Sequence, residues 1–294
     1  MLFRSTLFFN SSDTLFTNSK ASFSVYNQTG EMWNWEFFTS FYLEGYNKND
    51  TYAHLKIRKL LKTKKDSTAS LELYANYSKQ SPDYFLSNYR SNHYKWRNSF
   101  PAQEEKRIEL TYHKPSWHLS FGLKATAITN YVYFDTTGHP AVFNQNTNVL
   151  AAFVNKSFHA GGLGIDNKIT WQFVSDKNII PLPEIALYNS VYYGTYLFNK
   201  AILVNIGFDV FYNTAFYSQA YIPAINQFRN QNEKLIGNYP FIDVFLRAQI
   251  KRANLFVKFA HVNSGFFENT YFATLHYPAL RRAFKFGVSW RFIY

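Results

Sequence analysis

The last eleven residues of the chain alternate between apolar and polar side chains, a period of two that is typical of an extended strand. The apolar positions are Phe284, Phe286, Val288, Trp290, Phe292 and Tyr294. Lys285, Gly287, Ser289 and Arg291 lie between them. One face of this strand suits lipid or a protein core, and the other suits water. The pattern fits the end of a membrane barrel or the last strand of a soluble β-sandwich.

The same alternation recurs along the chain in about fourteen segments of roughly ten residues, the length that crosses a bilayer at a tilt. The clearest segments are 163–173, 202–212 and 242–250. Further candidates lie near 2–9, 19–27, 33–43, 55–57, 71–73, 106–113, 117–133, 148–158, 184–197 and 253–262. The sequence therefore predicts an all-β fold.

The connections between these segments alternate in length. Short ones are expected at 28–31, 62–67, 114–116, 159–162, 198–201 and 251–254. Long ones are expected at 10–18, 79–105, 135–147, 175–183, 213–240 and 263–281. Outer-membrane barrels have short periplasmic turns and long extracellular loops. We therefore predict one domain over 1–294, a transmembrane antiparallel up-and-down β-barrel. The first segment, 2–9, is only weakly apolar, so it is a poor candidate for the strand that closes the barrel. The alternative is that further strands precede it and that this chain is part of a larger barrel.

The composition favours this prediction. Aromatic residues make up 20% of the chain and charged residues 17%, and aromatic girdles mark the membrane interfaces of barrels. No apolar run approaches the ~18 residues of a membrane-spanning helix. The chain has no Cys, so disulfides and thiolate sites are excluded. A soluble aromatic-rich carbohydrate-binding β protein is the alternative, because exposed Tyr and Trp can stack on sugars.

The first residues do not form the apolar core of a signal peptide, because Arg4 and Asn10 interrupt it. An outer-membrane protein needs such a peptide. We expect that it was removed or that the chain is the C-terminal part of a longer one. At the other end, Phe286, Val288, Trp290, Phe292 and Tyr294 resemble the signal that the bacterial barrel-assembly machinery reads during insertion.

Several loop motifs resemble the Putative porin family of outer-membrane proteins from Bacteroidetes-type, Gram-negative bacteria. They are Gly45-Tyr-Asn47 with Asp50, Ser91 to Phe100, Tyr221-Ile-Pro223 with Phe228 and Gln231, Gly237 to Pro240 before Asp243, and Tyr277-Pro278 with Arg281. The resemblance implies a longer protein with a signal peptide, of which this chain is the C-terminal portion. The segment from Asn92 to Phe100 is either an extracellular ligand platform or a loop that packs on itself.

If the apolar face meets lipid, the alternation turns a set of charged residues toward the lumen. The basic residues are Lys56, Arg58, Lys124, Lys168, Arg247, Lys258, Lys285 and Arg291. The acidic ones are Glu36, Glu72, Asp166, Asp209 and Asp243. An excess of Lys and Arg predicts mild anion preference, whereas pairing of these charges across strands predicts a neutral or plugged pore.

Other functions find little support. The basic cluster of Lys59, Lys62, Lys64 and Lys65 lies at an expected short turn, so we predict no nucleic-acid partner. The eight His are scattered and no nucleophile elbow is present, so we predict no catalysis, no metal and no cofactor.

The sequence thus predicts an integral protein of the bacterial outer membrane that contacts lipid and lets small hydrophilic solutes diffuse passively. A non-conducting barrel, acting as a surface-binding or secretion-associated scaffold, is the alternative. The oligomeric state is left open.

Overall fold

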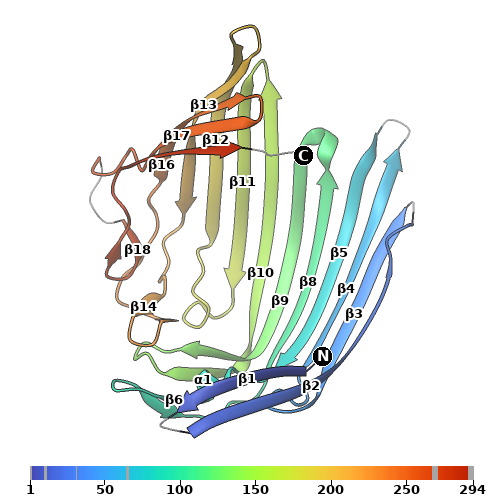
Figure 1. Ribbon diagram of the computed structural model, residues 1–294, viewed down its shortest axis with the longest axis vertical. Coiled ribbons are helices and arrows are strands. Elements are labelled where there is room, and N and C mark those ends of the chain that lie inside the picture. The colour runs from blue at the N-terminus through green and yellow to red at the C-terminus, as the bar shows by residue number, and fades with distance from the viewer. Residues whose placement is uncertain (1, 10–11, 31, 64–65, 267–270, 291–294) are drawn as a thin grey trace.

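The protein, as a computed structural model, is described for residues 2–9, 12–30, 32–63, 66–266 and 271–290. Within these residues, fourteen strands form one antiparallel sheet in which each strand pairs with the next one along the chain (Figure 1). The strands of this sheet are β1 (Leu2–Phe9), β2 (Ser12–Asn27), β3 (Trp33–Glu44), β4 (Thr51–Thr63), β5 (Asp66–Gln80), β8 (Gln103–Lys114), β9 (Leu119–Phe134), β10 (Pro140–Ala160), β11 (Leu163–Val174), β12 (Ile185–Leu197), β13 (Ile202–Asn213), β16 (Phe241–Ile250), β17 (Ala253–Ala260) and β20 (Ala283–Trp290). The predicted all-β, up-and-down order is confirmed.

The remaining elements lie in the connections. Three small hairpins are formed by β6 (Asn88–Arg90) with β7 (Lys95–Arg97), β14 (Ala220–Ile222) with β15 (Gln227–Arg229), and β18 (Phe272–Thr274) with β19 (Tyr277–Pro278). A short helix, α1 (Tyr84–Ser87), precedes β6, and a 3-10 helix, η1 (Pro115–Trp117), joins β8 to β9. No helix in the described part of the chain is long and apolar enough to cross a membrane.

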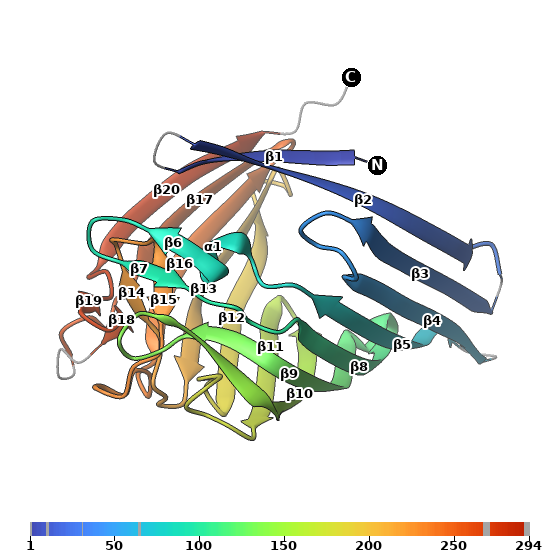
Figure 2. The same ribbon diagram turned by 90° about the horizontal axis from the view of Figure 1, so that it is seen from below.

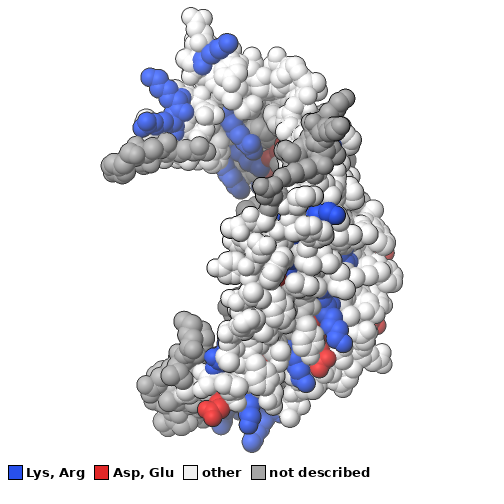
Figure 3. Space-filling view, turned by 90° about the vertical axis from the view of Figure 1, so that its right-hand side faces the viewer, with Lys and Arg blue, Asp and Glu red and all other residues white. Residues whose placement is uncertain are grey.

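The sheet is strongly curved but open. Figure 2 shows the strands arranged around a central space, and Figure 3 shows the molecule from the side as a crescent around a hollow. Among the described residues, β1 and β20 end the sheet and do not pair with each other. The structure therefore shows the curved wall of a barrel rather than its closure.

Strand register sorts side chains onto two faces. One row of directly opposed residues crosses five strands as Trp35, Ile57, Leu73, Leu110 and Leu123. Apolar side chains of this row are exposed, and Leu123 exposes 63% of its surface. The row therefore lies on an outward face suited to lipid. The next row along the strands is Glu36, Lys56, Tyr74, Glu109 and Lys124. We call the face that carries this second row the polar wall. The predicted alternation is confirmed here.

The polar wall lies on the concave side of the sheet. Lys258 on β17 reaches Asp209 on β13, with its Nζ 3.2 Å from Oδ2, although β16 runs between these strands. Such a contact requires side chains that converge, as they do on a concave face. The polar wall therefore faces the hollow.

Large aromatic side chains on the polar wall lie against glycines of neighbouring strands. Opposed pairs are Gly122 with Phe153, Gly164 with Tyr192, Gly207 with Tyr192, and Gly287 with Phe256. A Cβ atom at Gly287 would lie 2.5 Å from Cε1 of Phe256, closer than atoms can approach. Because glycine has no side chain, these positions leave room for the aromatic rings on the concave face of the sheet.

Two connections are shorter than predicted. The expected loop at 10–18 is wrong, because β2 already begins at Ser12, and the loop expected at 135–147 ends where β10 begins at Pro140. The polar run at 144–146 looked like a loop, but it lies at an irregularity in the pairing of β9 and β10, between Phe143 and Asn146. A bulge lets a strand continue through residues that break the alternation.

The first half of β2 extends beyond the main sheet at its long-loop end. Residues 12–18 pair with β1 alone, because pairing with β3 begins at Ser19. This ribbon crosses the base of the molecule beside α1 and β6 (Figure 1). Phe16 anchors it with ring centroids 5.2 Å from Tyr46 and 5.0 Å from Tyr84. The ribbon therefore lies across the end where the long connections gather.

A charge on the outward face should destabilise the protein in a bilayer. Leu246 lies halfway along β16 and is 40% exposed. We expect Leu246→Arg to lower the free energy of unfolding from lipid vesicles by about 2–4 kcal/mol, because the guanidinium enters hydrocarbon. Urea titration followed by tryptophan fluorescence measures this change.

Gln249→Arg is the matched control, since Gln249 lies on the polar wall of the same strand. We expect it to change the free energy of unfolding little. Equal losses for the two variants would contradict the assignment of the faces.

Candidate functional site

The predicted lumen residues lie together on the polar wall. Lys56 and Lys124 lie in one row of directly opposed residues that runs from β4 to β9. Asp166, Asp209 and Asp243 lie in another such row that runs from β11 to β16. The same alternation places the other described members of the set on this wall: Glu36, Arg58, Glu72, Lys168, Arg247, Lys258 and Lys285. Arg291 lies outside the described residues. The strands thus bring these charges to one surface.

Part of this charge is neutralised by ion pairs between strands. The Lys258 ammonium lies 2.7 Å from Asp243 and 3.2 Å from Asp209. The hydroxyl of Tyr188 donates a hydrogen bond of 3.1 Å to the Asp209 carboxylate, whose side chain is only 3% exposed. A buried carboxylate needs such partners, because an isolated charge is costly away from water. This cluster therefore has a structural role, and its one ammonium and two carboxylates leave one negative charge uncompensated.

A second group of pairs lies on the N-terminal half of the wall. Lys56 and Glu72 are 3.1 Å apart, and His54 approaches Glu36 at 3.5 Å. Arg107 contacts Glu105 of the same strand at 2.6 Å. The acidic residues of this half are thus largely paired. Lys56 and Glu72 thus pair across neighbouring strands, whereas Arg107 and Glu105 pair along one strand.

Several cations of the polar wall remain without an acidic partner. Among the described residues, no ion pair is formed by Arg58, Lys124, Lys168, Arg247 or Lys285. Lys168 and Arg247 lie instead over the rings of Tyr188 and Phe245. On the acidic side, Glu109 and Asp166 lack an ion pair in the same described set. The wall therefore carries more unpaired cations than unpaired acids, and these cations are free to act on solutes.

The long connections pack into an ordered layer at one end of the molecule, and Asn230 lies at its centre. Its side-chain amide donates to the carbonyls of Asn178 and Ile179 at 2.8 and 2.9 Å and accepts from Gln219 at 3.0 Å. Its backbone N–H donates to the carbonyl of Phe134. Because Asn230 is only 4% exposed, these bonds are sheltered from water. One residue thus joins the ends of β9 and β11 to the β14–β15 hairpin.

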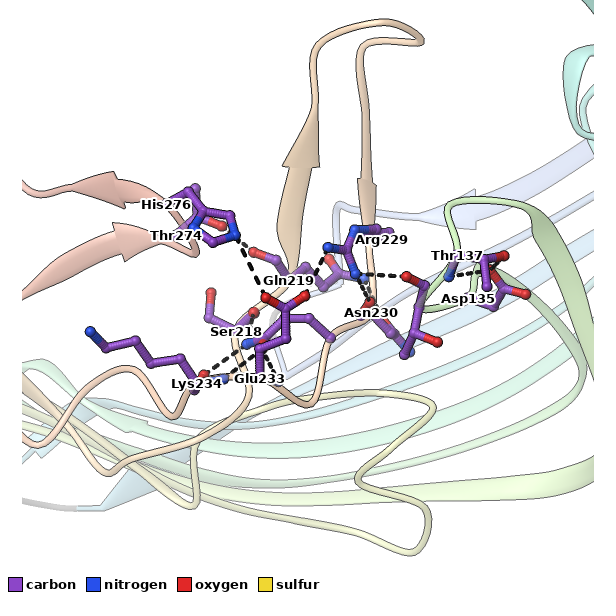
Figure 4. A network of polar contacts seen from close by, with 12 residues as sticks. Asp135, Thr137, Ser218, Gln219, Arg229, Asn230, Glu233, Lys234, Thr274 and His276 are labelled. Carbon is purple, nitrogen blue, oxygen red and sulfur yellow. Dashed lines mark hydrogen bonds and ion pairs between the residues drawn. The ribbon is translucent and has the colours of Figure 1, made fainter. Parts of the chain in front are cut away.

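Arg229 extends the same network (Figure 4). Its guanidinium donates to the carbonyl of Thr136 at 2.8 Å and to Glu233 at 3.1 Å. The other oxygen of Glu233 lies 3.6 Å from His276 in the β18–β19 hairpin. The β9–β10, β13–β16 and β17–β20 connections are therefore linked through polar side chains. We call these joined connections, together with the β11–β12 connection, the loop layer.

The turn at Asp135 is a further part of the loop layer. Its Oδ1 accepts hydrogen bonds from the backbone and hydroxyl of Thr137 at 2.8 and 2.6 Å and from the backbone of His139 at 3.1 Å. Partial burial raises the pKa of this carboxyl, but the hydrogen bonds from Thr137 and His139 outweigh it, so the pKa lies below its ordinary value. The ionised form of Asp135 therefore stabilises the turn.

The segment from Asn92 to Phe100 packs on itself and on its neighbours. Trp96 stacks on Tyr89 with ring centroids 4.7 Å apart, and its indole N–H donates to the carbonyl of Phe85 at 2.8 Å. This supports the packing interpretation. A cavity nevertheless remains beside these rings.

Sequence reasoning missed the residues that hold the loop layer together. Asp135, Arg229 and Asn230 were not selected, although Gln231 belongs to a motif that was. The signal was the polar run at 229–232 inside a long connection. A run of this kind is also typical of an exposed loop, so the pattern alone does not show that Asn230 is buried.

The predicted insertion signal lies on the last strand. Phe286, Val288 and Trp290 point to the outward face and are 75%, 65% and 58% exposed. Phe292 and Tyr294 lie outside the described residues. The recognition of this strand by an assembly machinery stays a prediction. In the described part of the chain, no three His, Asp or Glu residues gather as a metal site requires.

Comparison with solved structures finds outer-membrane receptors of the same fold. The ferric preacinetobactin receptor BauA of Acinetobacter baumannii is 14% identical with a TM-score of 0.59, over 95% of this chain and 43% of that one. The FrpB iron transporter of Neisseria meningitidis is 12% identical with a TM-score of 0.58, over 94% of this chain and 46% of that one. The chain thus spans less than half the length of these barrels.

Comparison with protein families and curated proteins gives two further results. The model of a family described as "Putative porin" matches residues 10–293, almost the whole chain. The curated proteins contain no match to this sequence.

Removal of the Asn230 amide should loosen the loop layer. We expect Asn230→Ala to destabilise the layer by about 1–3 kcal/mol, because buried carbonyls lose their donor. Hydrogen exchange should then rise in the connections at 135–139 and 175–184. Asn178→Ala is the control, since the carbonyl of Asn178 accepts from Asn230 while its exposed side chain makes no hydrogen bond in the described structure. Unchanged exchange in Asn230→Ala would contradict the role of Asn230.

The turn at Asp135 should weaken in acid. Because its pKa is below the ordinary value of about 3.9, stabilisation is complete above that value and is lost as the pH falls through the folded pKa. Amide protection of Thr137 and His139 should therefore decline below about pH 4. Asp135→Asn should lower this protection at neutral pH and remove its pH dependence. A variant that keeps the dependence would show that another group titrates.

Proposed function

Since the chain belongs to the Putative porin family and is an integral outer-membrane β-barrel protein, we propose that its polar wall lines an aqueous channel for passive diffusion of small hydrophilic solutes. The outward face would meet lipid and the concave face would meet water. Diffusion needs no reaction, and the proposal therefore assigns no catalytic residue. The insertion of such a wall would use the terminal strand as the signal for the barrel-assembly machinery.

The observation that supports a water-filled space is the free charge on the polar wall. Five cations face the hollow without an acidic partner in the described structure, and unpaired ammonium and guanidinium groups need water around them. A dry, plugged interior would require these groups to be paired or absent.

The same charge favours anions. Acidic residues of the wall are mostly held in ion pairs, such as those of Lys258 and Lys56, whereas Arg58, Lys124 and Lys168 are not. Fixed positive charge in a narrow aqueous space raises the local concentration of anions. We therefore expect anions to permeate faster than cations of similar size.

One observation favours the alternative, a non-conducting scaffold. The loop layer and the β1–β2 ribbon both lie at the long-loop end, and the hydrogen bonds of Asn230 and Arg229 hold the layer in place. A layer that covers the opening completely would block conduction. A planar-bilayer measurement separates the two functions, because a blocked barrel shows no conductance.

Reversal of charge on the polar wall should change the selectivity. In a KCl gradient, the reversal potential of the parent channel should lie closer to the equilibrium potential of chloride than to that of potassium. Lys124→Glu combined with Lys168→Glu should move it toward potassium, changing the permeability ratio by about severalfold, since fields of several kT act over such surfaces.

Lys106→Glu is the control, because Lys106 lies on the outward face with Ile108 and Leu110. It should leave the reversal potential of the parent nearly unchanged. Cation selectivity in the parent channel would refute the anion preference, and absence of conductance would refute the channel.

A further inference from the structure

The loop layer and the connection between β5 and β8 enclose a cavity of about 430 Å³ at the long-loop end. Its walls come from α1, the β6–β7 hairpin, the end of β9 and the β14–β15 hairpin. The lining residues are Asp83, Phe85, Leu86, Tyr89, Trp96, Phe134, Ile225 and Gln227. The volume falls in the range of about 300–1,000 Å³ that is typical of small-molecule sites. We propose that this cavity binds a neutral sugar.

The aromatic walls are held in fixed positions. Tyr89 and Trp96 are stacked, and the ring of Phe85 stands at 72° to Tyr89 while that of Phe134 stands at 69° to Trp96. The indole N–H of Trp96 is used by the carbonyl of Phe85, so the ring cannot turn without losing a hydrogen bond. Rigid rings that meet at steep angles form apolar walls for the C–H faces of a ring-shaped ligand.

Two polar side chains of the lining remain available to a ligand. Asp83 uses Oδ1 to accept from the backbone of Phe85 at 2.9 Å, and its Oδ2 has no hydrogen bond in the described structure. The exposed side-chain amide of Gln227 forms none either among those residues. Together they offer acceptors and a donor. Sugar hydroxyls donate and accept hydrogen bonds, and they match both groups.

Charge restricts the ligand to a neutral one. Asp83 is the one charged residue among the lining residues, and its carboxylate repels anions. The β6–β7 hairpin alternates the inward pair Tyr89 and Trp96 with positions that carry Arg90, Lys95 and Arg97. These three cations lie on the opposite face of the hairpin that forms one wall of the cavity, and their positive field disfavours a cationic ligand. A neutral ligand with hydroxyl groups satisfies both conditions.

This site is separate from the polar wall, since none of the charged wall residues lines it. Its location at the long-loop end, beside the opening of the hollow, would let it hold a sugar before any passage through the barrel. The inference therefore goes beyond the proposed channel and is tested without conductance.

Titration calorimetry of the full chain tests the proposal, in an amine-oxide detergent because maltoside detergents carry a sugar. The probes are glucose, maltose and cellobiose, with gluconate and glucosamine as anionic and cationic counterparts. We expect saturable heat from at least one neutral sugar and affinities about tenfold lower for the charged probes. No saturable heat from any neutral sugar with folded protein, or equal affinity for gluconate, would overturn the proposal.

Variants of the lining sharpen this test. Trp96→Ala should abolish binding, and Gln227→Ala, which changes an exposed side chain, should weaken it severalfold without affecting folding. Asp83→Asn should raise the affinity for gluconate relative to the parent, an effect that a misfolded loop cannot produce. Trp117→Ala is the control, since Trp117 lies in η1 at the opposite, short-turn end. Parent-like affinities in both Trp96→Ala and Gln227→Ala would place the sugar elsewhere and refute the site.

Discussion

The hydrogen bonds between neighbouring strands are the interaction on which the rest of this structure depends. In hydrocarbon, every backbone N–H and C=O must find a partner in the protein, and an antiparallel sheet supplies one on each side of a strand. The register that satisfies these bonds also decides which side chains face lipid, because a slip of one residue exchanges the faces. The row from Glu36 to Lys124 thus lies in the hollow as a consequence of backbone pairing.

The same requirement makes the two ends of the sheet informative. Within the described residues, β1 and β20 each have one edge without a partner in the main sheet. Such edges are not stable in lipid, so a membrane-embedded form needs further strand pairing at both. The β1–β2 ribbon lies across the long-loop end instead of continuing the curve (Figure 1). The wall and the covering of its opening are therefore built from one continuous sheet.

The alternation of side chains was sufficient to predict the strands, their order and the face on which Lys56, Lys124 and Asp209 lie. It failed where polarity and pairing disagree, as at 144–146, where a bulge keeps Asn-rich sequence in a strand. It also could not show that Lys258 contacts two carboxylates, because the contact with Asp209 depends on the curvature of the sheet. The alternation of side chains could not predict the loop layer for a similar reason. Arg229 contacts the carbonyl of Thr136, which lies 93 residues away, and no local period encodes that distance.

The loop layer is held mainly through main-chain acceptors. Asn230 binds the carbonyls of Asn178 and Ile179, and Arg229 binds that of Thr136. A carbonyl is present whatever residue occupies the position, so these contacts constrain the path of the loops and not their sequence. The side chains of Thr136 and Asn178 are exposed, so they can change while these main-chain contacts persist. The exposed surface of the loop layer can therefore diverge in sequence without rebuilding the fold beneath it.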